Sequence, residues 1–321
     1  MMNMLLDVRN LKMYYRTRRG HVKAVDGVNF SLNRGKALGL VGESGCGKTS
    51  IGITLLRILP TNAEVIEGSA LFDGTDILKI GEEEMRKYRW KRISMIFQGA
   101  MNALNPVHKV GDQIIEAIIT HEGISKEEAR ERVARLFELV GLNPDRMDNY
   151  PHEYSGGMRQ RAIIAMALAC NPDLIIADEP TTALDVIVQD KILREMRRIQ
   201  RETETAMIYI SHDISVIAET CDEIAVMYAG KIVERGPIER VFENPLHPYT
   251  KALMSAFPSV KGEKRRLETI PGEPPNLLHP PEGCRFHPRC PYAKPLCSEV
   301  EPLEEEFGNG RFASCHFAGE W

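Results

Sequence analysis

Short apolar runs, each closed by a glycine or a polar residue, recur at both ends of the first 245 residues. Residues 5–41 alternate as strands do, and residues 37–41 form an apolar run that stops at Gly42. Residues 174–177 and 207–210 are two further runs of this kind. Such runs are typical of buried parallel strands. The pattern predicts an α/β protein.

Local signals place turns and helices between these strands. The Asp-Gly pair at 73–74 and the Ala-Gly pair at 229–230 each divide two strand-like stretches, which predicts a hairpin at each pair. Residues 49–59 and 187–200 have helical periodicity, and we expect Pro60 to end the first of these two helices.

The middle of the chain contains a clear helix start. Ser125 and Glu128 have the spacing of a capping box, in which each side chain bonds the backbone of the other residue. Apolar residues follow at helical spacing, and Gly141 stands where a helix commonly ends. We therefore expect residues 99–162 to form a mainly helical insert.

The composition of the sequence changes from about Pro245 onward. Nine of the 19 prolines lie between Pro271 and Pro302, and each removes a backbone donor and fixes φ. This predicts that residues 271–302 contain no regular helix and no central strand. The predicted domains are a core (1–98 and 163–245), the helical insert (99–162) and a C-terminal extension (246–321).

Composition excludes several classes of protein. Hydrophobic residues make up 43% and charged residues 27% of the 321 residues, as in an ordinary globular protein. With 41 basic and 45 acidic residues the net charge is −4, which gives no global reason to coat nucleic acid or anionic lipid. The longest apolar run, residues 162–170, is about half the length of a membrane-spanning helix, and the first residues lack the features of a signal peptide. We expect a cytosolic protein without a transmembrane segment.

Residues 42–49, GESGCGKT, match the pattern G-x-x-x-x-G-K-[ST] between an apolar strand and a helix. The glycines let backbone N–H groups turn toward phosphate oxygens, and the helix N-terminus adds positive potential. Lys48 is expected to reach the β- and γ-phosphates, and Thr49 to offer its hydroxyl to Mg²⁺. The sequence therefore predicts a phosphate loop.

A second acidic element follows the apolar run at 174–177. Asp178 stands at the carboxyl end of this strand, where ligands of α/β sheets bind, and it is expected to hold Mg²⁺ directly or through water. Glu179 is placed to orient or deprotonate an attacking water.

Residues 155–161, SGGMRQR, complete a family resemblance. They resemble the signature motif of ATP-binding-cassette (ABC) ATPases, although Tyr154 and Met158 stand where the family usually has Leu and Gln. The resemblance covers residues 5–245. The other motifs also occur in family order, namely the phosphate loop, Gln98, the signature, Asp178 with Glu179, a D-loop at Ala183-Leu184-Asp185, and His212.

The resemblance implies a P-loop NTPase fold with a RecA-like core, an antiparallel β subdomain and the helical insert. It also implies that two cassettes pack head to tail around two ATP molecules, each bound by one chain's phosphate loop and the other chain's signature. The implied catalytic residues are Glu179, His212, Gln98 and Lys48, and the implied Mg²⁺ residues are Thr49, Gln98 and Asp178. The implied ATP-binding residues are Tyr15, Gly42, Ser44, Gly45, Cys46, Gly47, Lys48, Thr49, Ser50, Ser155, Gly156, Gly157 and Asp185. Tyr15 is the expected adenine-stacking residue, with Tyr14 as its competitor.

Three further stretches indicate a subfamily of these ATPases. The loop start at 42–45, residues 101–106 after Gln98, and residues 244–250 resemble ATPases that power import of dipeptides, oligopeptides or nickel. This resemblance implies a second ABC ATPase subunit in a heterodimer, with a homodimer as the alternative. It further implies two transmembrane permease subunits, an external peptide-binding protein and a place at the cytoplasmic face of the membrane. Peptide uptake is the expected function. The alternatives are a nickel or other solute importer and a soluble ABC ATPase acting on nucleic acid, which the single cassette and the absence of a basic stripe disfavour.

The extension holds four of the seven cysteines, Cys284, Cys290, Cys297 and Cys315. Four thiolates suit Zn²⁺ or a [4Fe–4S] cluster. The spacing lacks the close pairs of structural zinc sites and so favours the cluster, as does the resemblance to peptide-importer tails. Zinc, a disulfide and free thiols are the alternatives, and His287 and His316 are alternative nitrogen ligands. We expect the site to hold the extension together, because few apolar residues there can be buried.

Overall fold

The computed structural model describes residues 4–99, 103–182, 184–255 and 270–321. Chain contacts group these residues into two compact units. The signature unit contains residues 33–36 and 79–209. The phosphate-loop unit contains residues 4–32, 37–78 and 210–321.

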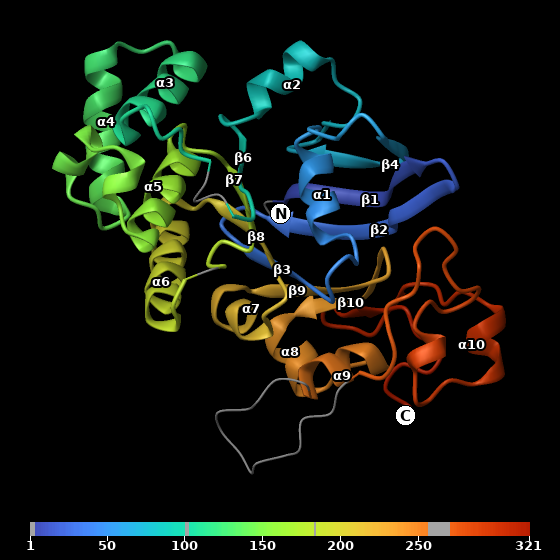
Figure 1. Ribbon diagram of the computed structural model, residues 1–321. Coiled ribbons are helices and arrows are strands. Elements are labelled where there is room, and N and C mark those ends of the chain that lie inside the picture. The colour runs from blue at the N-terminus through green and yellow to red at the C-terminus, as the bar shows by residue number, and fades with distance from the viewer. Residues whose placement is uncertain (1–3, 100–102, 183, 256–269) are drawn as a thin grey trace. The chain divides into compact units, whose positions relative to one another are not determined.

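The phosphate-loop unit begins with long antiparallel strands. In spatial order this sheet consists of β2 (Gly20–Asn33), β1 (Met4–Thr17), β4 (Ala63–Phe72) and β5 (Thr75–Asp76) (Figure 1). Between β4 and β5, Asp73 and Gly74 have φ angles of 52° and 82°. Positive φ at both central residues is the geometry of a tight hairpin turn, so the predicted hairpin is confirmed.

A second group of strands in this unit carries the strand that precedes the phosphate loop. Its order is β11 (Glu305–Glu306), β12 (Phe312–Ala313), β10 (Lys231–Pro237), β9 (Glu223–Tyr228) and β3 (Ala37–Val41). β3 and β9 are parallel, whereas the other neighbours are antiparallel. All residues of β3 are buried, and the hairpin predicted at 229–230 joins β9 to β10. The short apolar run thus forms the buried parallel strand that its pattern predicts.

Helix α1 (Lys48–Leu55) follows the phosphate loop and is shorter than its periodicity predicts. Its pattern extends to Pro60, but Leu56 already caps the helix and Arg57 adopts a left-handed φ of 52°. The backbone N–H of Arg57 donates to the carbonyl of Thr54 at 2.9 Å, which tightens the last turn. The helix therefore ends through a left-handed residue before the proline can act.

The extension is largely irregular, as its prolines predict, but it includes short elements. These elements are α9 (Pro248–Ser255), α10 (Pro295–Glu299) and a 3₁₀ turn at His287–Arg289, while α7 (Ile214–Thr220) and α8 (Ile238–Glu243) precede the extension in the same unit. The prediction that residues 271–302 contain no regular helix is wrong for α10. Pro295 occupies the first position of α10, where its missing N–H breaks no helical hydrogen bond.

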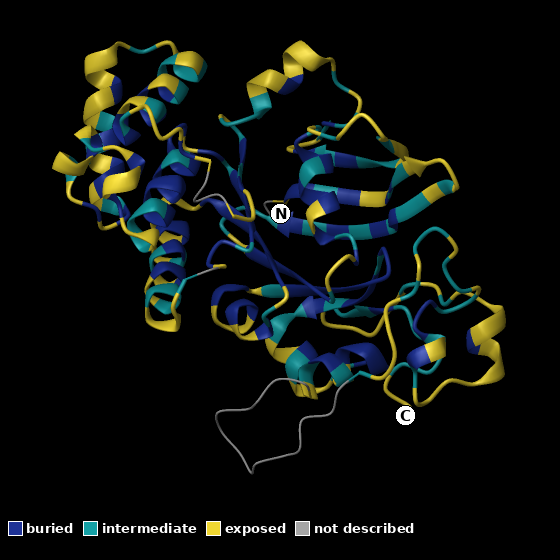
Figure 2. Cartoon of the chain, viewed as in Figure 1, coloured by how far each residue is buried: buried dark blue, intermediate teal, exposed yellow. Residues whose placement is uncertain are grey.

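The signature unit combines helices with three neighbouring strands in the order β8-β7-β6, of which β6 and β7 are parallel. Its elements are α2 (Glu82–Tyr88), β6 (Ile93–Ile96), α3 (Val110–Glu122), α4 (Lys126–Leu139), α5 (Gly156–Leu168), β7 (Leu174–Asp178), α6 (Val186–Thr203) and most of β8 (Ala206–Ser211), with 3₁₀ turns at Pro144–Asp148 and Pro151–Glu153. Helices α3 and α4 each show a buried and an exposed face (Figure 2). No helix in the described residues is long and apolar enough to cross a membrane.

The predicted capping box at the start of α4 is confirmed. The backbone N–H of Glu128 donates to Oγ of Ser125 at 3.2 Å, and the N–H of Ser125 donates to Oε2 of Glu128 at 3.0 Å. Gly141 follows the end of α4 with a positive φ of 69°, as its position after the helix predicts. Residues 103–162 are mainly helical, as expected of the insert, while residues 100–102 lie outside the described residues.

Candidate functional site

The phosphate loop joins β3 to α1 in a conformation that requires glycine at two positions. Gly42 and Gly47 have φ angles of 149° and 110°. A Cβ atom would lie 2.1 Å from a backbone carbonyl oxygen at Gly42 and 2.0 Å from one at Gly47. Ser44, Gly45 and Thr49 are exposed, so the loop presents them on its open side. The backbone is thus folded as a loop around an anion requires.

Lys48 lies across this loop. Its side chain is buried, and Nζ donates to the carbonyl oxygens of Gly42 at 2.7 Å and Glu43 at 3.0 Å. Cys46 is also buried, and this burial raises the pKa of its thiol despite the nearby ammonium. Lys48 is therefore held at the loop, and Cys46 fills the space behind it as a neutral thiol.

Two adjacent tyrosines of β1 have different partners. The hydroxyl of Tyr15 lies 3.0 Å from Oγ of Ser50 on α1. The hydroxyl of Tyr14 donates to Oδ1 of Asp26 at 2.6 Å, and burial and this carboxylate raise the pKa of Tyr14. Tyr15 is therefore the tyrosine beside the helix of the phosphate loop, while Tyr14 belongs to a cluster around Asp26.

His212 lies just after β8 and is exposed. The next residue, Asp213, is the N-cap of α7, and its side chain accepts from the N–H of Ser215 at 2.8 Å. The Ser-His-Asp sequence thus forms a strand-to-helix junction, which leaves the imidazole at the surface of the phosphate-loop unit.

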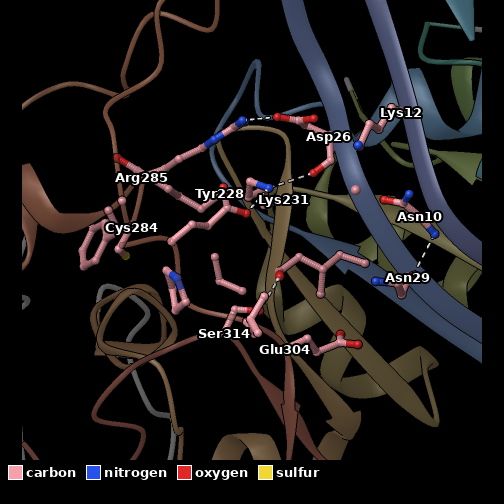
Figure 3. Close-up of a pocket in the computed structure, with 18 residues that line it drawn as sticks. Asn10, Lys12, Asp26, Asn29, Tyr228, Lys231, Cys284, Arg285, Glu304 and Ser314 are labelled. Atoms are coloured by element: carbon pink, nitrogen blue, oxygen red, sulfur yellow. Dashed lines mark hydrogen bonds and ion pairs between the residues drawn. The ribbon is translucent and has the colours of Figure 1, made fainter. Parts of the chain in front are cut away.

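Two arginines of the extension contact the cassette part of this unit. Arg289 donates from both terminal nitrogens to the carboxylate of Glu43, over 2.7 Å and 2.9 Å. Arg285 donates to the carboxylate of Asp26 (Figure 3). It also donates to the carbonyl of Ala229. Sequence reasoning missed both contacts. Their one weak signal is that each arginine stands next to a cysteine of the extension.

In the signature unit, Gln98 and Glu179 are brought together. Nε2 of Gln98 and Oγ1 of Thr182 each donate to Oε2 of Glu179 over 2.9 Å. Asp178 is buried at the end of β7, and Glu179 follows it with a left-handed φ of 48°. The carboxylate of Glu179 thus lies against Gln98, two residues after the end of β6.

The signature residues start helix α5. Ser155 is its N-cap, and Oγ accepts from the N–H of Met158 at 3.3 Å. A Cβ on Gly157 would lie 2.8 Å from Cγ1 of Val188, so glycine there permits the close approach of α6. Ser155 and Gly156 are exposed. The exposed start of α5 therefore offers backbone N–H groups to an anion.

The start of α6 is equally exposed. Asp185 is its N-cap and accepts from the N–H of Val188 at 3.0 Å. Val186 and Ile187 are each 81% exposed, which is unusual for large apolar side chains side by side. Ala183, the first residue of the predicted D-loop, lies outside the described residues.

Tyr154 explains one departure from the usual signature. Its ring is buried, and its hydroxyl donates to the carbonyl of Arg146 at 2.6 Å. Tyr154 thus fills the apolar position that precedes the signature serine, while its hydroxyl keeps a hydrogen-bond partner.

The four cysteines of the extension line one small cavity together with His247 and Trp321. These four cysteines are free thiols. Burial raises the pKa of Cys284 to about 12 and also raises that of Cys290 and Cys315. Among the described residues, no three His, Cys, Asp or Glu side chains are arranged to hold a metal ion. The cluster site therefore stays a prediction.

Residues 25–182 match the family model "ABC transporter", and residues 233–297 match "Oligopeptide/dipeptide transporter, C-terminal region". The chain is 47% identical to the oligopeptide transport ATP-binding protein OppD of Haemophilus influenzae, over 99% of each chain. It is 49% identical to OppD of Escherichia coli, over 97% of this chain and 92% of that protein. The chain belongs to the ABC transporter ATPases of the oligopeptide/dipeptide transporter family.

Other comparisons agree with this assignment. This chain is 47% identical to the dipeptide transport ATP-binding protein DppD of Bacillus subtilis, over 98% of this chain and 95% of that protein. The dimeric ATP-binding cassette MJ0796 bound to ADP and Pi matches its structure with a TM-score of 0.65, at 25% identity, over 73% of this chain and 99% of that chain. The predicted P-loop NTPase fold and the ABC family are thus confirmed.

Proposed function

We propose that this ABC transporter ATPase powers the uptake of di- or oligopeptides, acting at the cytoplasmic face of the membrane with permease subunits. The observation that carries this proposal is the family match in both parts of the chain. The cassette matches ABC transporters in general, but residues 233–297 match a region named for oligopeptide and dipeptide transporters. The oligopeptide and dipeptide transport proteins described above are similar to this chain over nearly their whole length.

The phosphate loop would bind the polyphosphate of ATP. Its open side presents Ser44, Gly45 and Thr49, and Lys48 is already held at the loop. Thr49 and Asp178 have the oxygen donors that Mg²⁺ prefers, and the ion would offset phosphate charge. Tyr15, beside Ser50, is the residue we assign to the adenine base.

Glu179 would position the attacking water. Its carboxylate is fixed by two neutral donors, Gln98 and Thr182, which orient the group without adding charge to it. An oriented carboxylate can accept a proton from water or hold the water for in-line attack. His212, exposed after β8, is the residue that we assign to the γ-phosphate.

A second ABC subunit would complete the site. Exposed N–H groups at the start of α5, capped by Ser155, suit the γ-phosphate of an ATP bound by a partner. The exposed Val186 and Ile187 lie directly after Asp185 and supply an apolar surface of the kind that marks interfaces. We propose a head-to-tail heterodimer of two ABC subunits that drives two membrane permease subunits, with an external peptide-binding protein delivering cargo.

The four cysteines of the extension would hold a [4Fe–4S] cluster, with Zn²⁺ as the alternative. The donor set fits, because four thiols line one cavity and thiolates are the usual ligands of such clusters. Two N–H groups of cavity-lining residues, Nε2 of His247 and Nε1 of Trp321, are buried without a hydrogen-bond partner. Such donors suit the acceptor sulfurs of a cluster and of its cysteine ligands.

Transport in proteoliposomes tests the cargo. The chain is purified with the permease and ATPase subunits that co-purify with it and is reconstituted with candidate binding proteins. We expect a peptide-loaded binding protein to stimulate ATP hydrolysis and uptake of labelled peptide. Stimulation by a nickel-loaded binding protein instead would overturn the peptide assignment but leave the ATPase assignment intact.

A further inference from the structure

Glu43 of the phosphate loop is held at three points. Its N–H donates to the hydroxyl of Tyr249 at 3.0 Å, and its carbonyl accepts from Nζ of Lys48 at 3.0 Å. Its carboxylate accepts both terminal nitrogens of Arg289 over 2.7 Å and 2.9 Å. The cassette therefore supplies Lys48, α9 supplies Tyr249, and the cysteine-bearing part of the extension supplies Arg289.

Arg289 is itself immobilised by its surroundings. Nε donates to the carbonyl of Pro271 at 2.7 Å, and a terminal nitrogen donates to the carbonyl of Gly272 at 3.2 Å. The other terminal nitrogen also lies 3.3 Å from the hydroxyl of Tyr228. The side chain of Arg289 is only 6% exposed. A bidentate pair with a guanidinium fixed in this way sets both the position and the charge of the Glu43 carboxylate.

A second arginine of the extension, Arg285, supports the phosphate loop near Cys46 indirectly, through the turn between β9 and β10. Arg285 donates to the carbonyl of Ala229. The next residue, Gly230, donates its N–H to the carbonyl of Cys46 at 2.9 Å and accepts from the N–H of Asp26 at 2.8 Å. The extension thus supports the loop at both Glu43 and Cys46.

We propose that Arg289 is a positioning residue of the nucleotide site, and that the extension thereby forms part of that site. An unpaired carboxylate at Glu43 would repel the phosphates of ATP and would be free to distort the loop. Arg289 neutralises this charge and holds the loop in its anion-binding form before ATP arrives. The inference rests on the proposed role of the phosphate loop in ATP binding.

Binding of a fluorescent ATP analogue with Mg²⁺ to the purified full chain tests the inference. Loss of a charge-assisted bidentate pair predicts that Arg289→Ala weakens affinity about tenfold. Glu43→Gln removes the repelling charge but also one acceptor of the pair, so it is expected to weaken affinity less than Arg289→Ala does. The double variant should recover to the affinity of Glu43→Gln, because the charge that Arg289 offsets is then gone. Arg289→Lys keeps the positive charge but cannot form two parallel hydrogen bonds. Its affinity should therefore fall between those of the native chain and Arg289→Ala.

Glu304→Gln is the matched control. It removes another bidentate pair between extension and cassette, Arg235 with Glu304 over 2.8 Å and 3.1 Å, which does not contact the loop. Its affinity should equal that of the native chain. The midpoint of thermal unfolding is measured for every variant, so that a general loss of structure is recognised.

The outcomes separate the inference from the proposed function. Native affinity in Arg289→Ala, or a double variant as weak as Arg289→Ala, overturns the positioning role. In those cases Lys48→Ala should still abolish binding, which leaves the ATP site assignment in place. Native binding by Lys48→Ala would mean that the loop is not the ATP site, and the inference would fall with it.

Discussion

Nε2 of Gln98 and Oε2 of Glu179 lie 2.9 Å apart in a hydrogen bond. Gln98 follows β6 and Glu179 follows β7, two parallel neighbours, so the contact joins the carboxyl ends of adjacent strands. This arrangement gives Glu179 a fixed orientation before any water is bound.

Glu179→Gln should abolish ATP turnover while leaving ATP binding intact. The amide keeps the shape of the side chain but cannot accept a proton, so we expect the rate to fall by at least about 100-fold. Steady-state hydrolysis and nucleotide binding are measured on the assembled transporter. Glu195→Gln on α6, which removes a surface ion pair with Arg198, serves as control and should hydrolyse normally. Normal turnover by Glu179→Gln would show that another group activates water.

Gly47→Ala should lose ATP binding and stability together. Its Cβ would lie 2.0 Å from a backbone oxygen, so either the loop or the neighbouring strand must move. Gly45→Ala is the matched control, because it shares a positive φ of 78° but no atom lies within 4 Å of its Cβ. We expect Gly45→Ala to cost only about 1 kcal/mol of stability, from strain alone, which is less than the loss in Gly47→Ala. Thermal unfolding and nucleotide titration compare the two variants, and equal losses would contradict the steric argument.

Arg285→Met should destabilise the phosphate-loop unit by about 3 kcal/mol, because it leaves the Asp26 carboxylate buried without its cation. The two side chains are only 6% and 11% exposed. Adding Asp26→Asn removes the stranded charge, so the double variant should be more stable than Arg285→Met alone. Denaturant unfolding followed by fluorescence measures the difference. A double variant less stable than Arg285→Met would show that the pair is not what stabilises this region.

Anaerobically purified protein should contain about four iron and four sulfide per chain, as a [4Fe–4S] cluster requires. Replacing any one of Cys284, Cys290, Cys297 or Cys315 by serine should reduce the iron and sulfide contents. Cys170→Ala, outside the extension, should not change them. Metal analysis, sulfide analysis and visible absorption are the measurements. Zinc without sulfide would replace the cluster assignment by the zinc alternative.

Cys46 should react slowly with alkylating reagents in the folded chain. Burial raises the pKa of Cys46, so less thiolate is present at pH 8 than for an ordinary thiol, and reactivity should rise only at higher pH. Cys170, whose pKa burial raises to about 11, should behave in the same way. Mass spectrometry of chains alkylated before and after unfolding measures this. Rapid modification of Cys46 at pH 8 in the folded chain would contradict its burial.

The features predicted correctly are those in which a few consecutive residues decide the outcome. The capping box at Ser125, the hairpin at 73–74 and the apolar run of β3 each depend on local chemistry. Helix α1 ends early because Arg57 takes a left-handed conformation, which no simple residue preference requires. The pair of Glu43 and Arg289 joins residues 246 positions apart, and no local pattern marks either as a partner of the other. The phosphate-loop residues could therefore be singled out from the sequence, but not the arginine of the extension that contacts them.

The pairing of β12 with β10 determines where the chain can be truncated without exposing a strand edge. Glu234 and Arg235 of β10 align with Ala313 and Phe312 of β12, and the Arg235 guanidinium lies 3.6 Å from the centre of the Phe312 ring. A chain truncated after residue 245 would keep β10 but leave that flank with open backbone donors and acceptors, which recruit strands from other molecules. An isolated cassette cut at its apparent boundary is therefore expected to precipitate or self-associate for reasons unrelated to nucleotide binding.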